Sequence, residues 1–142
     1  MSYSTHYSKQ SLSDQAIEFR NGYQVSNSLS NRSTQKSLID EEYKEFCTAH
    51  TKEPNVNILK ELADLVYVCY QYAENMEWDL DEAMHRVHRS NMSKLGLDGN
   101  PIRRADGKVL KGPNYKPPTL TDLVNLYVTR TYLPNRTRPI LD

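Results

Sequence analysis

One stretch of the chain, residues 38–68, reads LIDEEYKEFCTAHTKEPNVNILKELADLVYV and is the most informative about the fold. Apolar residues recur at helical spacing on both sides of Pro54, and a proline is common where a helix begins. We therefore expect one helix over about residues 33–50 and another over about residues 55–76. Because the link between them is short, the two helices should pack antiparallel.

The helix expected over residues 33–50 carries an unusual stripe. Leu38, Glu42, Glu45 and Ala49 are separated by four, three and four residues, so they share one face of a helix. The stripe begins and ends with apolar side chains. The two glutamates should therefore point toward the protein interior or a cleft.

The second helix repeats the pattern with Glu61 and Asp64, three residues apart. This helix is apolar nearly all round, so we expect it to be central. Across an antiparallel pair, Glu45 and Glu61 lie at similar distances from the link, and the four carboxylates can converge. Neither of the nearby basic residues, Lys44 and Lys60, is expected on the acidic stripe, so a hard divalent cation such as Mg²⁺ would have to compensate their repulsion.

Two other interpretations of these residues stay open. Acidic runs on helices are commonly solvated surface charges, although the inward stripe and the repeated spacing argue against this here. A zinc site at His85 and His88 would need a third ligand, and no other Cys or His has matching spacing.

Helix signals also flank the central pair. A first helix is expected to begin at residues 13–14, and a fourth at Asp79, whose spacing to Glu82 is that of a capping box. The fourth should run to about Ser93, since Gly96 is a stop signal.

The C-terminal third has the composition of loops and turns. Short extended runs joined through residues 105–107 predict a β-hairpin, and Thr119 or Thr121 is expected to cap a short last helix. The predicted fold is all-α, a bundle of four to five helices with a short β-hairpin near the C-terminus. We expect a flexible tail over residues 1–13, one domain over residues 14–118, and a short helix and tail over residues 119–142.

Composition narrows the possible functions. The 142 residues suffice for one domain, and the formal net charge of zero gives no broad basic field for a nucleic-acid polymer. No apolar run approaches ~18 residues, so no membrane span is expected.

Cys47 and Cys69 lie in apolar helical patterns without a CxxC motif, which predicts reduced, buried thiols in a cytoplasmic protein. The chain also lacks the P-loop, GxGxxG and GxSxG motifs.

Taken together, EExxE at residues 41–45 and ExxD at residues 61–64 resemble the MazG-like, all-α nucleoside triphosphate pyrophosphohydrolase superfamily. VHRSNMSKLG (residues 87–96) matches it in order, and GKVLKGPNYKPP (residues 107–118) resembles one bacterial and phage branch. Relatives often carry a basic residue at the position of Gln35.

The resemblance implies site residues and a cofactor. It assigns Mg²⁺, with Mn²⁺ as a substitute, to Glu42, Glu45, Glu61 and Asp64, and leaves Glu41 as a supporting group or base. It also implies that Asn91 and Lys94 hold phosphates and that Lys111 and Tyr115 contact the substrate. Family members commonly form homodimers or homotetramers.

The expected activity is Mg²⁺-dependent hydrolysis of a (d)NTP to the monophosphate and pyrophosphate, in the cytoplasm, or in the host cytoplasm if a phage encodes the chain. An alternative is a pyrophosphohydrolase of another nucleotide, such as phosphoribosyl-ATP or an alarmone. A third possibility is a non-catalytic helical module that binds a nucleotide or a partner protein.

Overall fold

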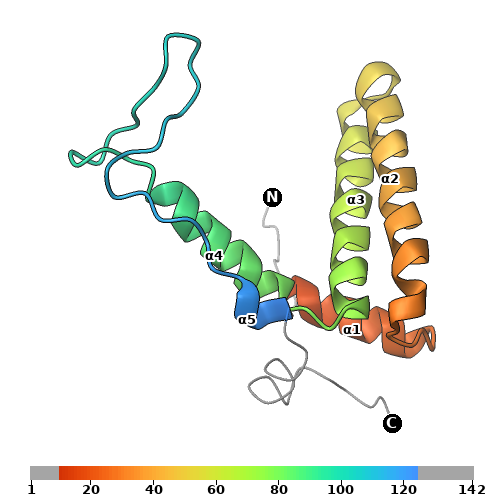
Figure 1. Cartoon of the computed structure of the whole chain (residues 1–142). Helices are drawn as coiled ribbons and strands as arrows, with labels where there is room; N and C mark the ends of the chain where they lie inside the picture. Colours follow the sequence, from red (N-terminus) through yellow and green to blue (C-terminus); the bar gives the residue numbers. More distant parts are fainter. Residues whose placement is uncertain (1–9, 125–142) are drawn as a thin grey trace, which may run out of the picture.

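The computed structural model describes residues 10–124, and in that range the protein is all-helical (Figure 1). The predictions for residues before 10 and after 124, which cover most of both predicted tails and part of the last helix, lie outside the described residues; the predicted N-terminal tail of residues 1–13 overlaps α1, which begins at Leu12. The elements in chain order are α1 (Leu12–Gly22), the 3₁₀ turn η1 (Leu29–Asn31), α2 (Arg32–Lys52), α3 (Asn55–Asn75), α4 (Leu80–Met92) and α5 (Thr121–Val124). The four main helices lie where the sequence predicts them.

Helices α2 and α3, each of 21 residues, form an antiparallel hairpin (Figure 1). Glu53 between them adopts an extended backbone with φ −117° and ψ 159°, as expected for a residue before proline. Pro54 then caps α3. Ala49 is completely buried, and its small side chain lets the two helices approach closely. We call this hairpin the α2–α3 arm.

Helix α1 crosses the base of this arm and is held there by a buried polar network. The Arg20 guanidinium, 3% exposed, donates to Asn27 Oδ1 at 2.7 Å, to Asn75 Oδ1 at 3.0 Å and to the Ser26 carbonyl at 3.2 Å. Burial lowers the pKa of Arg20, and the charge of Glu74 partly offsets that effect. The network joins α1, the loop before α2 and the end of α3.

The start of α1 differs slightly from the prediction. Ser11, rather than Ser13 or Asp14, is the cap, and its hydroxyl accepts from the Asp14 amide at 3.1 Å. Serine and aspartate both cap well, so sequence alone does not choose between these three residues. Ser13 is buried instead and donates its backbone N–H to Asp81 of α4.

Helix α4 begins as predicted, because Asp79 Oδ1 accepts from the Glu82 amide at 3.0 Å. It then diverges from the α2–α3 arm and contacts α1 and α3 near its own start (Figure 1). The described chain is therefore an open, two-armed structure rather than a closed bundle. We call α4 with residues 93–118 the α4 arm.

The predicted β-hairpin is present only as a turn. Arg103 and Val109 form an isolated antiparallel bridge, flanked by a hydrogen bond from the Leu110 amide to the Ile102 carbonyl at 2.7 Å. Gly107, with φ +87°, supplies the left-handed turn. No strand forms among the described residues, because a solvent-exposed two-stranded ribbon gains little from packing.

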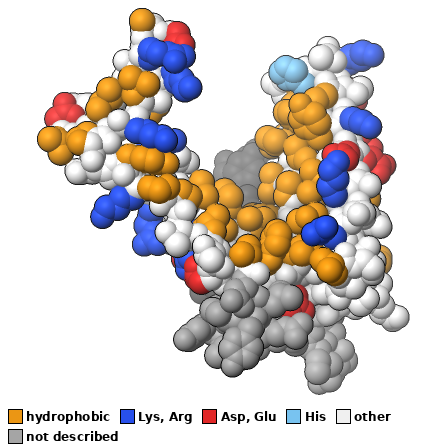
Figure 2. Space-filling view, in the orientation of Figure 1, with side chains coloured by type: hydrophobic (Ala, Val, Ile, Leu, Met, Phe, Trp, Pro, Cys, Tyr) orange, Lys and Arg blue, Asp and Glu red, His pale blue; other side chains and the backbone are white. Residues whose placement is uncertain are grey.

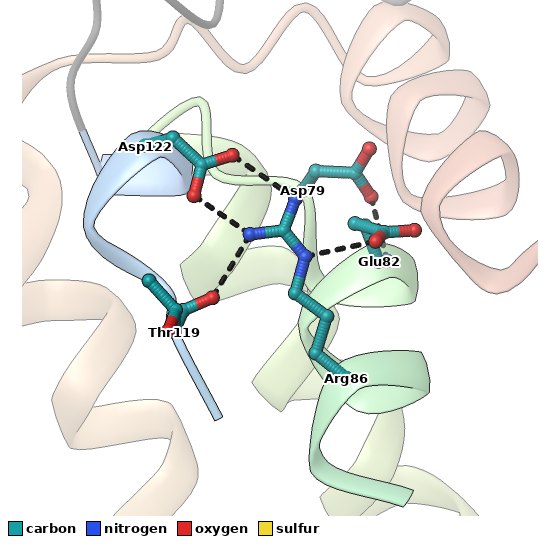
Figure 3. Close-up of polar contacts among 5 residues, drawn as sticks. All are labelled: Asp79, Glu82, Arg86, Thr119 and Asp122. Atoms are coloured by element: carbon teal, nitrogen blue, oxygen red, sulfur yellow. Dashed lines mark hydrogen bonds and ion pairs between the residues drawn. The ribbon is translucent and has the colours of Figure 1, made fainter. Parts of the chain in front are cut away.

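The segment that follows the α4 arm is tied back to α4 by Arg86 (Figure 3). Its guanidinium donates to both carboxylate oxygens of Asp122, at 2.6 and 3.0 Å, to the Thr119 carbonyl at 2.9 Å, and to Glu82 at 2.9 Å. This bidentate contact raises the pKa of Arg86 and lowers that of Asp122. It fixes α5 beside the first turns of α4.

The face of α3 that points away from α2 is apolar and exposed. Leu59, Leu62 and Val66 are 66%, 42% and 42% exposed, and with side chains of α1 they line an open groove of about 370 Å³. Figure 2 shows this apolar surface on the inner side of the arm, facing the gap toward α4. The expectation that α3 is central is wrong for the single chain, because α2 covers one side of it only.

Two further expectations concern the cysteines and membrane-spanning helices. Both cysteines are free, but Cys47 is exposed rather than buried, whereas Cys69 is partly buried and its pKa is raised by that burial. Within residues 10–124, no helix is both long enough and apolar enough to cross a membrane.

We predict that Arg20→Met lowers the free energy of unfolding by about 2–3 kcal/mol, because it removes the donor to the buried Gln71 Oε1 and one of the two donors to the buried Asn75 Oδ1. Urea denaturation measures the change. Arg32→Met, at an exposed arginine of α2, is the control and should stay within about 0.5 kcal/mol of the wild type. Equal stability of the two variants would contradict the structural role of the network.

Candidate metal-binding site

The acidic stripes of α2 and α3 face each other across the seam of the α2–α3 arm. Glu42 and Glu45 come from α2 and Glu61 from α3, and one carboxylate oxygen of each lies within 4.8 Å of the others. The spacing of three residues places the pair from α2 on one helix face, and the antiparallel packing brings Glu61 opposite. Three of the four predicted ligands are therefore brought together.

The cluster is partly buried, and two of its carboxylate oxygens lack a hydrogen-bond partner within residues 10–124. Among the described residues, Glu42 Oε2 and Glu61 Oε2 are buried oxygens with no hydrogen-bond partner. Burial raises the pKa of Glu42, and the charges of Glu45, Asp64 and Glu61 raise it further, while Lys60 opposes them. Unpaired buried carboxylate oxygens are unfavourable, so these positions suit a bound cation.

Asp64, the fourth predicted ligand, lies beside the cluster but is engaged differently. Its Oδ2 pairs with Lys60 Nζ at 2.8 Å, and the same ammonium lies 3.3 Å from Glu61 Oε1. These contacts raise the pKa of Lys60 above its ordinary value. The expectation that Lys60 stays away from the acids is therefore wrong. The spacing of four residues between Lys60 and Asp64 is the signal that predicts this pair.

The donor set fits a hard divalent cation. All the candidate ligand atoms are carboxylate oxygens, which Mg²⁺ and Mn²⁺ prefer. Four acids against one lysine leave a net negative charge that a divalent cation can balance. Among residues 10–124 this is the one cluster of three or more potential ligands, and its members are all glutamates.

Two other residues of α2 were singled out from the sequence. Glu41 is exposed and is not part of the converging group. Gln35 lies on the same stripe, two turns before Glu42, and is only 7% exposed. Its Oε1 is buried without a hydrogen-bond partner in the described part of the chain.

The predicted substrate contacts lie on the other arm. Lys94 Nζ donates to Asn91 Oδ1 at 2.9 Å at the end of α4, and Lys111 Nζ lies 4.6 Å from the centre of the Tyr115 ring. Within one chain the α4 arm runs away from α2 and α3, so these residues do not join the carboxylates (Figure 1).

Comparison with known proteins gives one family. The model of the phosphoribosyl-ATP pyrophosphohydrolase family matches residues 12–91, more than half of the chain. The match spans α1 to the end of α4 and includes all four acids and Asn91, but it stops before Lys94, Lys111 and Tyr115. No curated protein matches the chain significantly.

The raised pKa of Glu42 predicts a pH-dependent stability in metal-free buffer. Its pKa is higher in the folded protein than the ordinary value of 4.5, so its contribution is complete below that value and is lost as the pH rises through the folded-state pKa. Glu42→Gln stays neutral and escapes the loss. We expect this variant to be more stable than the wild type at neutral pH.

Thermal unfolding between acidic and neutral pH tests this expectation. The difference between Glu42→Gln and the wild type should shrink on acidification, and Glu41→Gln, at the neighbouring exposed position, should show no such trend. A difference that is independent of pH would mean that Glu42 does not hold its proton more tightly in the fold.

Proposed function

The chain belongs to the phosphoribosyl-ATP pyrophosphohydrolase family, within the MazG-like all-α NTP pyrophosphohydrolase superfamily, and on this premise we propose that it is a Mg²⁺-dependent enzyme that releases pyrophosphate from a nucleotide triphosphate group. The observation that carries the proposal is the convergence of Glu42, Glu45 and Glu61 within 4.8 Å. Intact acids at all four positions argue against a non-catalytic relic.

In this proposal the site residues have separate roles. Glu42, Glu45, Glu61 and Asp64 hold the metal ion. When bound, Mg²⁺ would neutralise the triphosphate and favour hydrolysis at the α-phosphorus. Glu41, the first acid of the EExxE run, is assigned the role of a supporting group or base on the basis of the resemblance. Asn91 and Lys94 are assigned to the phosphates on the basis of the resemblance.

Two substrates are the leading candidates, and both carry a triphosphate. The family name favours phosphoribosyl-ATP, which the sequence alone placed second, over a free (d)NTP. A (d)NTP remains a candidate because the run over residues 107–118, which resembles a bacterial and phage branch, lies outside the matched segment. An alarmone is a further candidate with the same type of bond.

We predict that Glu61→Gln and Asp64→Asn each reduce turnover roughly a hundredfold or more, because each removes a metal ligand. Pyrophosphate release is measured with phosphoribosyl-ATP, the common NTPs and dNTPs, and an alarmone, at saturating Mg²⁺. Asp40→Asn is the control, since Asp40 lies on α2 and pairs with Lys36 outside the cluster.

The wild type should be active on one of these substrates and lose activity when the metal is chelated. Near-normal turnover in both site variants, or activity that survives chelation, would refute the assignment. Circular dichroism of each variant confirms that the helices are intact.

We also propose that a second copy of the chain covers the exposed face of α3. This face offers Leu59, Leu62 and Val66 in one continuous apolar strip, and such strips are normally covered. Charge also favours a second copy as the partner: residues 32–75 of the α2–α3 arm hold five Lys or Arg and eight Asp or Glu, whereas residues 80–118 of the α4 arm hold eight Lys or Arg and four Asp or Glu. An acidic and a basic arm in each copy make two copies complementary.

We predict that Leu59→Asp, combined with Val66→Asp, converts a homodimer or homotetramer into a monomer, because it places charges in the apolar contact. Sedimentation velocity measures the mass. Leu29→Asp is the control, because Leu29 is 70% exposed but lies on η1, away from this face. A wild-type protein that is monomeric at micromolar concentration would refute the proposal.

A further inference from the structure

Lys60 occupies a distinctive position at the acidic cluster. Its ammonium lies 2.8 Å from Asp64 Oδ2 and 3.3 Å from Glu61 Oε1, so it bridges two of the four acids. Among the described residues, it is the cation that forms ion pairs with this group. The cluster thus contains a positive charge supplied by the chain itself.

The position of Lys60 conflicts with a divalent cation. An ammonium at Asp64 Oδ2 and Glu61 Oε1 competes with a metal ion for these two oxygens, and two cations at neighbouring sites repel each other. The pair is easily broken, since the Lys60 side chain is 63% exposed and exposed ion pairs are weak. The long, flexible stem of lysine can then move the charge into solvent.

We propose that Lys60 is a built-in counter-ion, which holds Asp64 and Glu61 in the metal-free protein and leaves them when a divalent cation binds. Lys60 therefore weakens metal binding and stabilises the metal-free fold. The inference rests on the metal site of the proposed function. It concerns the affinity for the ion and the stability of the metal-free protein, so it is testable without a substrate.

The chain offers a matched control on the neighbouring helix. Lys36 Nζ pairs with Asp40 Oδ2 at 2.8 Å, with the same spacing of four residues and similar exposure, 67% for the lysine. Asp40 is not part of the cluster. Lys36→Met removes an equivalent surface ion pair without touching the acids.

The experiment compares Mn²⁺ binding to the wild type, Lys60→Met, Lys60→Arg and Lys36→Met, by electron paramagnetic resonance at low ionic strength. We expect about tenfold tighter binding for Lys60→Met, because one unit of repulsion is removed, and a smaller gain at high salt. Lys60→Arg keeps the charge and should bind as the wild type does, and so should Lys36→Met.

A second measurement needs no metal. In chelator-treated buffer, Lys60→Met should unfold at a lower temperature than Lys36→Met, since four acids then repel without a counter-ion. Adding Mn²⁺ should remove this difference, which also shows that the variant folds.

The outcomes separate this proposal from the function. Equal or weaker Mn²⁺ affinity in Lys60→Met, with normal binding by the wild type, would overturn the counter-ion role and leave the metal site intact. An equal gain in Lys36→Met would show a general charge effect and also overturn it. Absence of Mn²⁺ binding in every protein would refute the metal site and, with it, this inference.

Discussion

Repulsion between carboxylates held in one helical seam is the constraint on which the rest of the structure depends. The two-residue link at Glu53 and Pro54 turns the chain back, and the small Ala49 side chain lets the helices approach until Glu42 and Glu61 share a partly buried space. Like charges at this distance destabilise the fold unless a cation joins them. The cluster is therefore a place where charge repulsion opposes the stability of the fold, and such arrangements are common at functional sites.

The sequence predicts this site well because the site depends on the spacing of residues within each helix. Helical spacing fixes which side chains share a face, and Pro54 and Asp79 mark helix starts whose geometry the structure bears out. The contact of Lys60 was missed because Lys60 lies off the acidic stripe, although its spacing of four residues from Asp64 predicts the ion pair. The missing strands have a similar cause: Gly107 identifies a turn but says nothing of how far pairing extends beyond it.

The open arrangement of the arms could not be predicted for a different reason. Amphipathic spacing shows that α3 and α4 have apolar faces, but not which surface covers them, and a second chain satisfies the pattern as well as an intramolecular neighbour does. The family match covers only the four main helices, since it ends at residue 91, near the end of α4. Residues beyond the match, such as Lys111 and Tyr115, can therefore differ from those of other family members.

The unequal exposure of the two cysteines has a practical consequence. Cys47 is accessible and lies two residues from Glu45 on α2, whereas burial raises the pKa of Cys69 and keeps its thiol protonated. A maleimide fluorophore would therefore attach selectively at Cys47, without any engineered residue. Its emission would report ion loading in the adjacent seam in real time, through quenching by a paramagnetic ion.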